Sequence, residues 1–71
     1  MTQQLVLSGP EIELILEVLE SEQKELLIEI RHTDHAGFRA GLKQRLTVVE
    51  SLIHQAEALA HAEQLALGNR S

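Results

Sequence analysis

The sequence lacks cysteine, tryptophan and tyrosine, and it has a single phenylalanine, Phe38, and a single proline, Pro10. Without cysteine the chain forms no disulfide and offers no thiolate to a metal. The shortage of aromatic rings argues against binding of single-stranded nucleic acid, which depends on base stacking. The formal net charge of −5 would also repel a phosphate backbone. We therefore expect no nucleic-acid partner.

Long apolar runs are missing as well. No stretch reaches the length of about 20 apolar residues that a transmembrane helix needs. The start, Met1 to Gln4, lacks the basic region and apolar run of a signal peptide. These absences predict a cytoplasmic protein without membrane contact. The 71 residues suffice for one domain, 1–71, and so short a chain hides only about 60% of the surface that its unfolded form exposes.

What the sequence does contain is a strong helix start. Ser8 can cap a helix and Glu11 can reach back to it, which is the pattern of a capping box, and Pro10 suits the first turn. Apolar residues then recur at steps of three and four, the period of a helix rather than a strand. We expect an N-terminal extension over residues 1–8 and a helix over 9–32. The apolar positions are Ile12, Ile15, Leu16, Leu19, Leu26, Leu27 and Ile30.

A second helix is predicted over residues 35–67, followed by a tail at 68–71. Asp34 can serve as its N-cap, with Thr33 as the alternative. Gly37 and Gly41 weaken its first turns, which we interpret as a close approach of the two helices near the turn. Its apolar positions alternate mostly in steps of four and three. They are Phe38, Leu42, Leu46, Val49, Ile53, Ala56, Ala60 and Leu67.

The short connection between the helices predicts an all-α fold, an antiparallel helix–turn–helix hairpin. A residue i of the first helix would lie beside roughly residue 67 − i of the second, so that Ile30 meets Phe38. The second helix is the longer, and its end would be covered either by residues 5–7 or by a second copy. The ion pairs expected across this register are Glu29 with Arg39 and Glu25 with Lys43.

Both helices also carry apolar residues well away from their main stripes. Two helices cannot cover stripes this wide, so we expect these residues to form an interface through which two hairpins dimerise into a four-helix bundle. Gln23 lies on the main stripe, where a polar residue often fixes register or partner orientation; partial exposure is the alternative. The predicted interface residues are Leu14, Val18, Ile28, Val48, Leu52 and Leu59.

A metal site is the main competing prediction. His32, Asp34 and His35 gather at the turn, and imidazole nitrogen with carboxylate oxygen suits zinc or another transition metal. In the simpler interpretation His32 lies in the last helical turn, where the helix dipole favours it, and Asp34 caps the next helix. We therefore expect no metal and no other cofactor.

Other polar clusters point to catalysis even less. Glu29 and His32 match the Glu-x-x-His pattern of di-iron bundles, but on a helical wheel both face away from the apolar stripe. His54, Glu57 and His61 lie near one side of the second helix and are interpreted as exposed polar residues. No serine has an organised base beside it. The chain is predicted not to be an enzyme.

Residues 29–35, followed by 38–45, are similar to a type of short bacterial hypothetical protein. Those proteins have a Leu/Glu-rich first helix, an E-I-x-x-T-D turn and a Phe/Tyr-Arg-x-x-Leu-Lys segment. The resemblance spans residues 7–53 and leaves out the Ala-rich end. It implies a helical hairpin and no activity, and it favours Thr33 and Asp34 as a structural turn over a metal site.

The sequence therefore predicts a homodimeric structural or protein–protein interaction module without catalytic activity. Two alternatives stay open. One is a metal-binding protein that uses His32, Asp34 and His35. The other is an acidic accessory subunit of a heteromeric complex, with its apolar stripe covered by an unknown protein partner.

Overall fold

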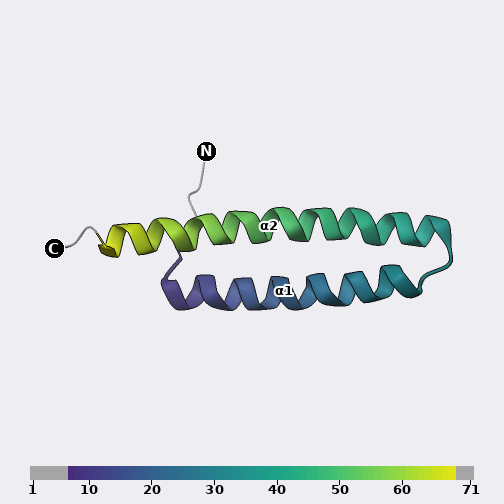
Figure 1. Cartoon of the computed structure of the whole chain (residues 1–71), viewed down its shortest axis with the longest axis horizontal. Coiled ribbons are helices and arrows are strands. Elements are labelled where there is room, and N and C mark those ends of the chain that lie inside the picture. Colours follow the sequence, from purple (N-terminus) through teal and green to yellow (C-terminus); the bar gives the residue numbers. More distant parts are fainter. Residues whose placement is uncertain (1–6, 69–71) are drawn as a thin grey trace.

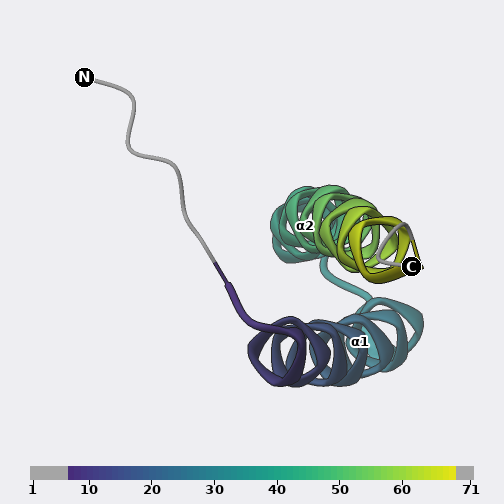
Figure 2. The same cartoon turned by 90° about the vertical axis from the view of Figure 1, so that its left-hand side faces the viewer.

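The computed structural model describes residues 7–68 of the chain, with side chains up to residue 64. Helix α1, Gly9–His32, is followed by α2, Ala36–Gly68, and this part of the chain contains no strand. The helices lie side by side in opposite directions, and α2 extends past the start of α1 (Figure 1). The end-on view shows the turn joining the pair (Figure 2). The all-α hairpin is thus confirmed, whereas the predicted cover by Leu5 and Val6 and the tail beyond Gly68 lie outside the described residues.

Helix α1 has the predicted bounds because its first turn is capped as expected. The Ser8 backbone N–H donates to Oε1 of Glu11 at 2.9 Å, and the Glu11 N–H donates to the Ser8 hydroxyl at 3.4 Å. Ser8 itself is extended, with φ −76° and ψ 164°. This reciprocal pair satisfies two amides that a helix start would otherwise leave without a partner.

Helix α2 begins one residue later and ends one residue later than the predicted 35–67. The N-cap is His35 rather than Asp34: its carbonyl accepts from the Arg39 N–H at 2.9 Å, and its Nδ1 accepts from the Phe38 N–H at 3.4 Å. The Thr33 hydroxyl meanwhile donates back to the carbonyl of Glu29 at 2.6 Å. Thr33 thus remains bonded to the end of α1, and His35, rather than Asp34, is the residue bonded to the first amides of α2.

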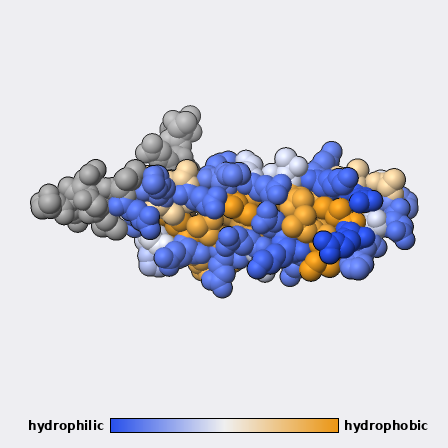
Figure 3. Space-filling view, in the orientation of Figure 1, coloured by the Kyte–Doolittle hydropathy of each residue, from blue (hydrophilic) through white to orange (hydrophobic). Residues whose placement is uncertain are grey.

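The core is one seam between the helices. Its α1 positions follow strict steps of four and three from Ile12 to Ile30, as in a two-stranded coiled coil. All of the buried residues belong to the predicted apolar stripes. Apolar surface also remains exposed between the two helices (Figure 3). The buried residues are Ile12, Leu26, Ile30, Val49, Ile53 and Ala56. Partly buried around them are Leu16, Leu19, Leu42 and Leu46.

Two residues predicted for the core are exposed instead: Leu27 at 47% and Phe38 at 62%. Leu27 follows Leu26, so it is turned about 100° away from the seam. Phe38 precedes Leu42 by four residues, and a second step of four follows to Leu46. Each step of four overshoots a helical turn by about 40°, so the seam drifts away from Phe38 near the turn.

The predicted close approach near the turn does not occur. A Cβ added at Gly41 would meet nothing within 4 Å, and one at Gly37 would meet only the His35 ring, at 3.5 Å. The tight place lies at the opposite end of the hairpin, where a Cβ at Gly9 would stand 3.0 Å from Oε1 of Glu63.

Two polar pairs join the helices across the seam, and neither has the predicted partners: Glu22 with Arg45 keeps the predicted register, whereas Gln23 reaches Glu50, six residues past its predicted position. Arg45 Nε donates to Oε1 of Glu22 at 2.9 Å, and Nε2 of the partly buried Gln23 donates to Oε2 of Glu50 at 3.2 Å. These bonds lie on opposite faces of the hairpin, because Glu22 and Gln23 are about 100° apart around α1.

The pairs Glu29 with Arg39 and Glu25 with Lys43 do not form. Glu25 follows Val18 by one heptad and shares its face, whereas Lys43 precedes Glu50 by one heptad and shares the other face. Glu25 and Lys43 therefore project from opposite sides of the hairpin. Arg39 precedes the seam residue Leu46 by one heptad, so it does not share the face of Glu29.

Candidate protein interface

All six residues predicted to form an interface are exposed in the hairpin. Between 43% and 61% of the surface of each is accessible, so none of them belongs to the core. On α1 they are Leu14, Val18 and Ile28, and on α2 they are Val48, Leu52 and Leu59. Burying such side chains is favourable by about 25 cal/mol per Å² of apolar area. The packing of α1 against α2 leaves this apolar area in contact with water.

Three of the six come together in a shallow groove. The groove is lined by Val18 and Leu19 of α1 and by Val48, Val49 and Leu52 of α2. The ion pair between Glu22 and Arg45 lies at the same groove. We call the surface formed by these five apolar residues the apolar groove. The sequence alone did not show that Val18 lies on the same face as Val48 and Leu52.

The opposite face of the hairpin is polar. Its groove is lined by acidic residues of both helices together with Gln23 and His54. Val48 and Glu50 flank the buried Val49 and point about 100° to either side of it, which separates the two faces. His54 Nδ1 lies 3.8 Å from Oε1 of Glu57, and both side chains are exposed.

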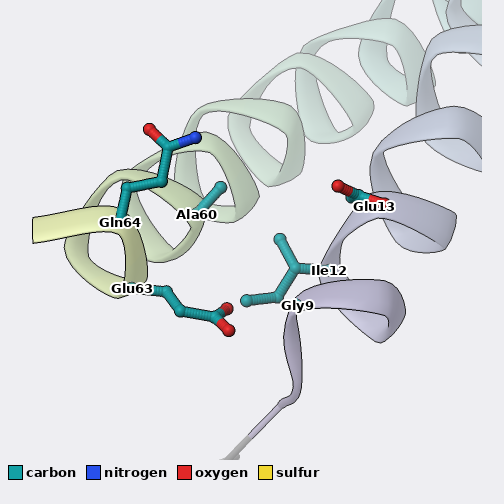
Figure 4. Close-up of a pocket in the computed structure, with 6 residues that line it drawn as sticks. All are labelled: Gly9, Ile12, Glu13, Ala60, Glu63 and Gln64. Carbon is teal, nitrogen blue, oxygen red and sulfur yellow. The ribbon is translucent and has the colours of Figure 1, made fainter. Parts of the chain in front are cut away.

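A third hollow lies at the open end of the hairpin, where α1 begins (Figure 4). Ile12 points toward Ala60, whose short side chain leaves the gap, and the Glu63 carboxylate reaches toward Gly9. Glu13 and Gln64 lie at its rim. A carboxylate beside the first turn of a helix suits the positive end of the helix dipole.

The charge of the chain is divided unevenly between the two helices. Helix α1 contains seven glutamates against Lys24 and Arg31, whereas α2 contains three glutamates against three basic residues. The three basic residues of α2 are Arg39, Lys43 and Arg45. The net charge of −5 thus comes from α1, and α2 is balanced.

The candidate metal ligands at the turn do not form a site. His32, Asp34 and His35 are all exposed, and Nδ1 of His35 is occupied as the helix cap. Within the described part of the chain no group of three or more His, Asp or Glu side chains is placed to hold a metal ion. The Glu29 and His32 pair is exposed as well.

The fold perturbs the carboxyl group of Glu11. The Ser8 backbone N–H, first, and the Ser8 hydroxyl, second, hydrogen-bond to its carboxylate and lower its pKa below the usual glutamate value. The carboxylate is fully exposed and belongs to the helix cap. Its shift therefore reports on helix capping and not on catalysis.

The chain matches no protein-family model, no curated protein and no solved structure. Neither helix, over residues 9–68, is both long enough and apolar enough to cross a bilayer. The feature of the described residues that most needs an explanation is the exposed apolar surface around the apolar groove.

Proposed function

We propose that the protein is a self-associating structural or interaction module without catalytic activity. Two hairpins pack through their apolar grooves and form a homodimeric four-helix bundle. The observation that carries the proposal is the cluster of Val18, Val48 and Leu52, each at least 43% exposed and gathered on one face.

The size of the core supports the same proposal. Small domains rarely obtain more than about 3–5 kcal/mol from a single core, and oligomerisation is a common remedy when disulfides and metals are lacking. This chain has no cysteine, and its buried residues lie along the single seam between α1 and α2. A specific interface buries about 800 Å² per partner, a modest part of the chain's 6068 Å² of accessible surface.

Sedimentation equilibrium of the untagged protein at micromolar concentration tests the proposal. We expect twice the 7.9 kDa mass of the chain. Leu52→Glu places a charge in the apolar groove and should weaken the dimer about 30-fold or more, the effect of losing an interface hot spot. A folded monomer of the natural chain would contradict the proposal.

Leu27→Glu is the matched control. Leu27 is 47% exposed, close to the 43% of Leu52, but it follows Glu20 by one heptad and so belongs to the polar face. We expect this variant to remain dimeric. If Leu27→Glu dissociates the dimer and Leu52→Glu does not, the copies associate through the polar face, which contradicts the proposal.

An acidic accessory subunit is the competing assignment, and the seven glutamates of α1 are the observation that favours it. In that case the purified chain is monomeric, and a different protein occupies the apolar groove. Sedimentation separates the two functions directly, because only the homodimer has a doubled mass without any added partner.

A further inference from the structure

We propose that His35 is a pH-sensitive cap of α2: its neutral imidazole holds residues 36–41 in the helix, and protonation of the imidazole releases them. This inference goes beyond the proposed self-association and does not depend on it, because the capping contact lies within one chain. Three features of the turn support it: the hydrogen bond that His35 accepts, the weak packing of the helix that follows, and the charges nearby.

The cap depends on an unprotonated ring nitrogen. Nδ1 of His35 accepts from the Phe38 N–H at 3.4 Å, which is the bond that an N-cap side chain makes to the third residue of a helix. The imidazole lies against the first turn, since a Cβ added at Gly37 would stand 3.5 Å from Cε1 and 3.7 Å from Nδ1. In neutral histidine one ring nitrogen accepts and the other donates, whereas in the protonated form both donate. A protonated His35 therefore has no acceptor for the Phe38 amide.

The helical segment that follows the cap has little packing to hold it. Every residue from Ala36 to Gly41 is exposed, and burial on α2 begins only at Leu42. Phe38, the large apolar side chain of this segment, is 62% exposed. Gly37 and Gly41 are poor helix formers, and a Cβ added at Gly41 would meet nothing within 4 Å. The first turns of α2 thus depend on hydrogen bonding at the cap.

The positive end of the α2 dipole acts in the same direction. This dipole disfavours a cation at the start of a helix, and the first turn of α2 contains no acidic side chain to offset it. Among the described residues none forms an ion pair with His35. The two acids around the turn offset the two arginines, which leaves the dipole and the lost hydrogen bond as the main effects of protonation. The titratable and charged groups there, from both helices and the connection, are Glu29, Arg31, His32, Asp34 and Arg39.

The consequence is a turn that loosens in mild acid. Histidine is the side chain whose charge changes between pH 5 and 8. Because the capped helix requires the neutral imidazole, residues 36–41 are helical at the upper end of this range and fray as the pH falls to the lower end. Fraying stops at Leu42, which packs against the core cluster, so the connection grows from residues 33–35 to residues 33–41 while the seam stays intact.

His32 provides a contrast within the same turn. It lies in the last turn of α1, at the negative end of that helix dipole, where protonation is favourable. His32 and His35 therefore respond to acid with opposite sign. A fraying response that belongs to His35 must survive the loss of His32.

NMR of the ¹³C- and ¹⁵N-labelled chain at pH 8 and pH 5 tests the proposal. The ¹³Cα shifts report helicity residue by residue, and the imidazole ¹⁵N shifts report which ring nitrogen carries the proton. At pH 8 we expect Nδ1 of His35 without a proton and helical shifts over residues 36–41. At pH 5 the equilibrium should move about 2- to 30-fold toward the frayed form, the effect of losing an N-cap, with helical shifts retained from Leu42 onward.

Three substitutions separate the cap from other causes. His35→Asn supplies a capping side chain that does not titrate, so residues 36–41 should stay helical at both pH values. His35→Ala removes the capping side chain and should fray the segment at both pH values. His32→Asn is the matched control and should keep the response of the natural chain.

Several results would overturn the proposal. One is a natural chain whose residues 36–41 are equally helical at pH 8 and pH 5. An equal loss of helix at pH 5 in His35→Asn would assign the response to another group, and its disappearance in His32→Asn would assign it to His32. A proton on Nδ1 of His35 at pH 8, or a His35→Ala chain as helical as the natural one at that pH, would show that the imidazole does not cap α2.

Discussion

Leu26 and Leu27 are neighbours in the chain with the same side chain and opposite surroundings. Leu26 is 3% exposed in the middle of the core cluster, next to Val49 and Ile53, whereas Leu27 is 47% exposed. The difference comes from one residue of helical rotation, about 100°. Whether an apolar side chain lies on the seam therefore decides how much it contributes to the stability of the fold.

We expect Leu26→Ala to lower the free energy of unfolding by about 2–5 kcal/mol, the range for truncating a buried leucine. Leu27→Ala removes the same atoms from a solvent-facing position and should cost about 0.5 kcal/mol or less. Urea unfolding followed by circular dichroism, at one fixed protein concentration, measures both. Equal losses in the free energy of unfolding would show that Leu27 is buried too, which contradicts a solvent-exposed polar face.

At the scale of the helices, the capping box gives α1 a defined response to acid. The folded-state pKa of Glu11 is lowered by its hydrogen bonds from Ser8. A lowered folded-state pKa contributes stability that is complete above the unfolded value of about 4.3 and is lost as the pH falls through the lower folded value.

Glu11→Gln should therefore reduce the melting temperature near pH 6 and have a smaller effect as the pH falls through the lowered folded-state pKa of Glu11, because the natural carboxylate then becomes protonated too. Glu13→Gln is the control, since Glu13 is exposed and lies outside the capping box. Thermal unfolding at several pH values gives the comparison. A constant difference between Glu11→Gln and the natural chain across this range would contradict the capping account.

Much of the hairpin could be predicted from particular residues. Ser8 and Glu11 defined the start of α1, and the stripes of three- and four-residue steps contained every buried position. The start of α2 could not be predicted as well, because His35 is an uncommon N-cap and the sequence does not show that Thr33 is bound to Glu29. The fold depends on such local competition between hydrogen-bond donors and acceptors.

The exposure of the predicted interface residues was also predictable, since each lies off its stripe. Their arrangement on faces was not. Placing Val18 beside Leu52 requires the rotation of both helices about the seam, a quantity that is invisible in either helix alone. The same missing information explains why Glu25 was expected to pair with Lys43, although the two project from opposite sides of the hairpin.

At the scale of the whole molecule, folding and association should be one process. A dimer that forms only from folded chains is stabilised by mass action, so its melting temperature rises with protein concentration. We expect a rise of a few degrees for each tenfold increase, since a tenfold change corresponds to about 1.4 kcal/mol. Calorimetry over two decades of concentration measures it.

The Leu52→Glu variant supplies the comparison for this experiment. Its melting temperature should be lower and independent of concentration, because the isolated hairpin unfolds without dissociating. If the natural chain shows the same independence, its stability comes from α1 and α2 alone, and the exposed apolar residues then have no role in folding.

The uneven charge of the two helices gives the hairpin an electric polarity across its short dimension. The negative potential is concentrated along α1, which has seven glutamates against two basic residues, whereas the charges of α2 balance. A polybasic peptide or cationic surface would be drawn to α1 first.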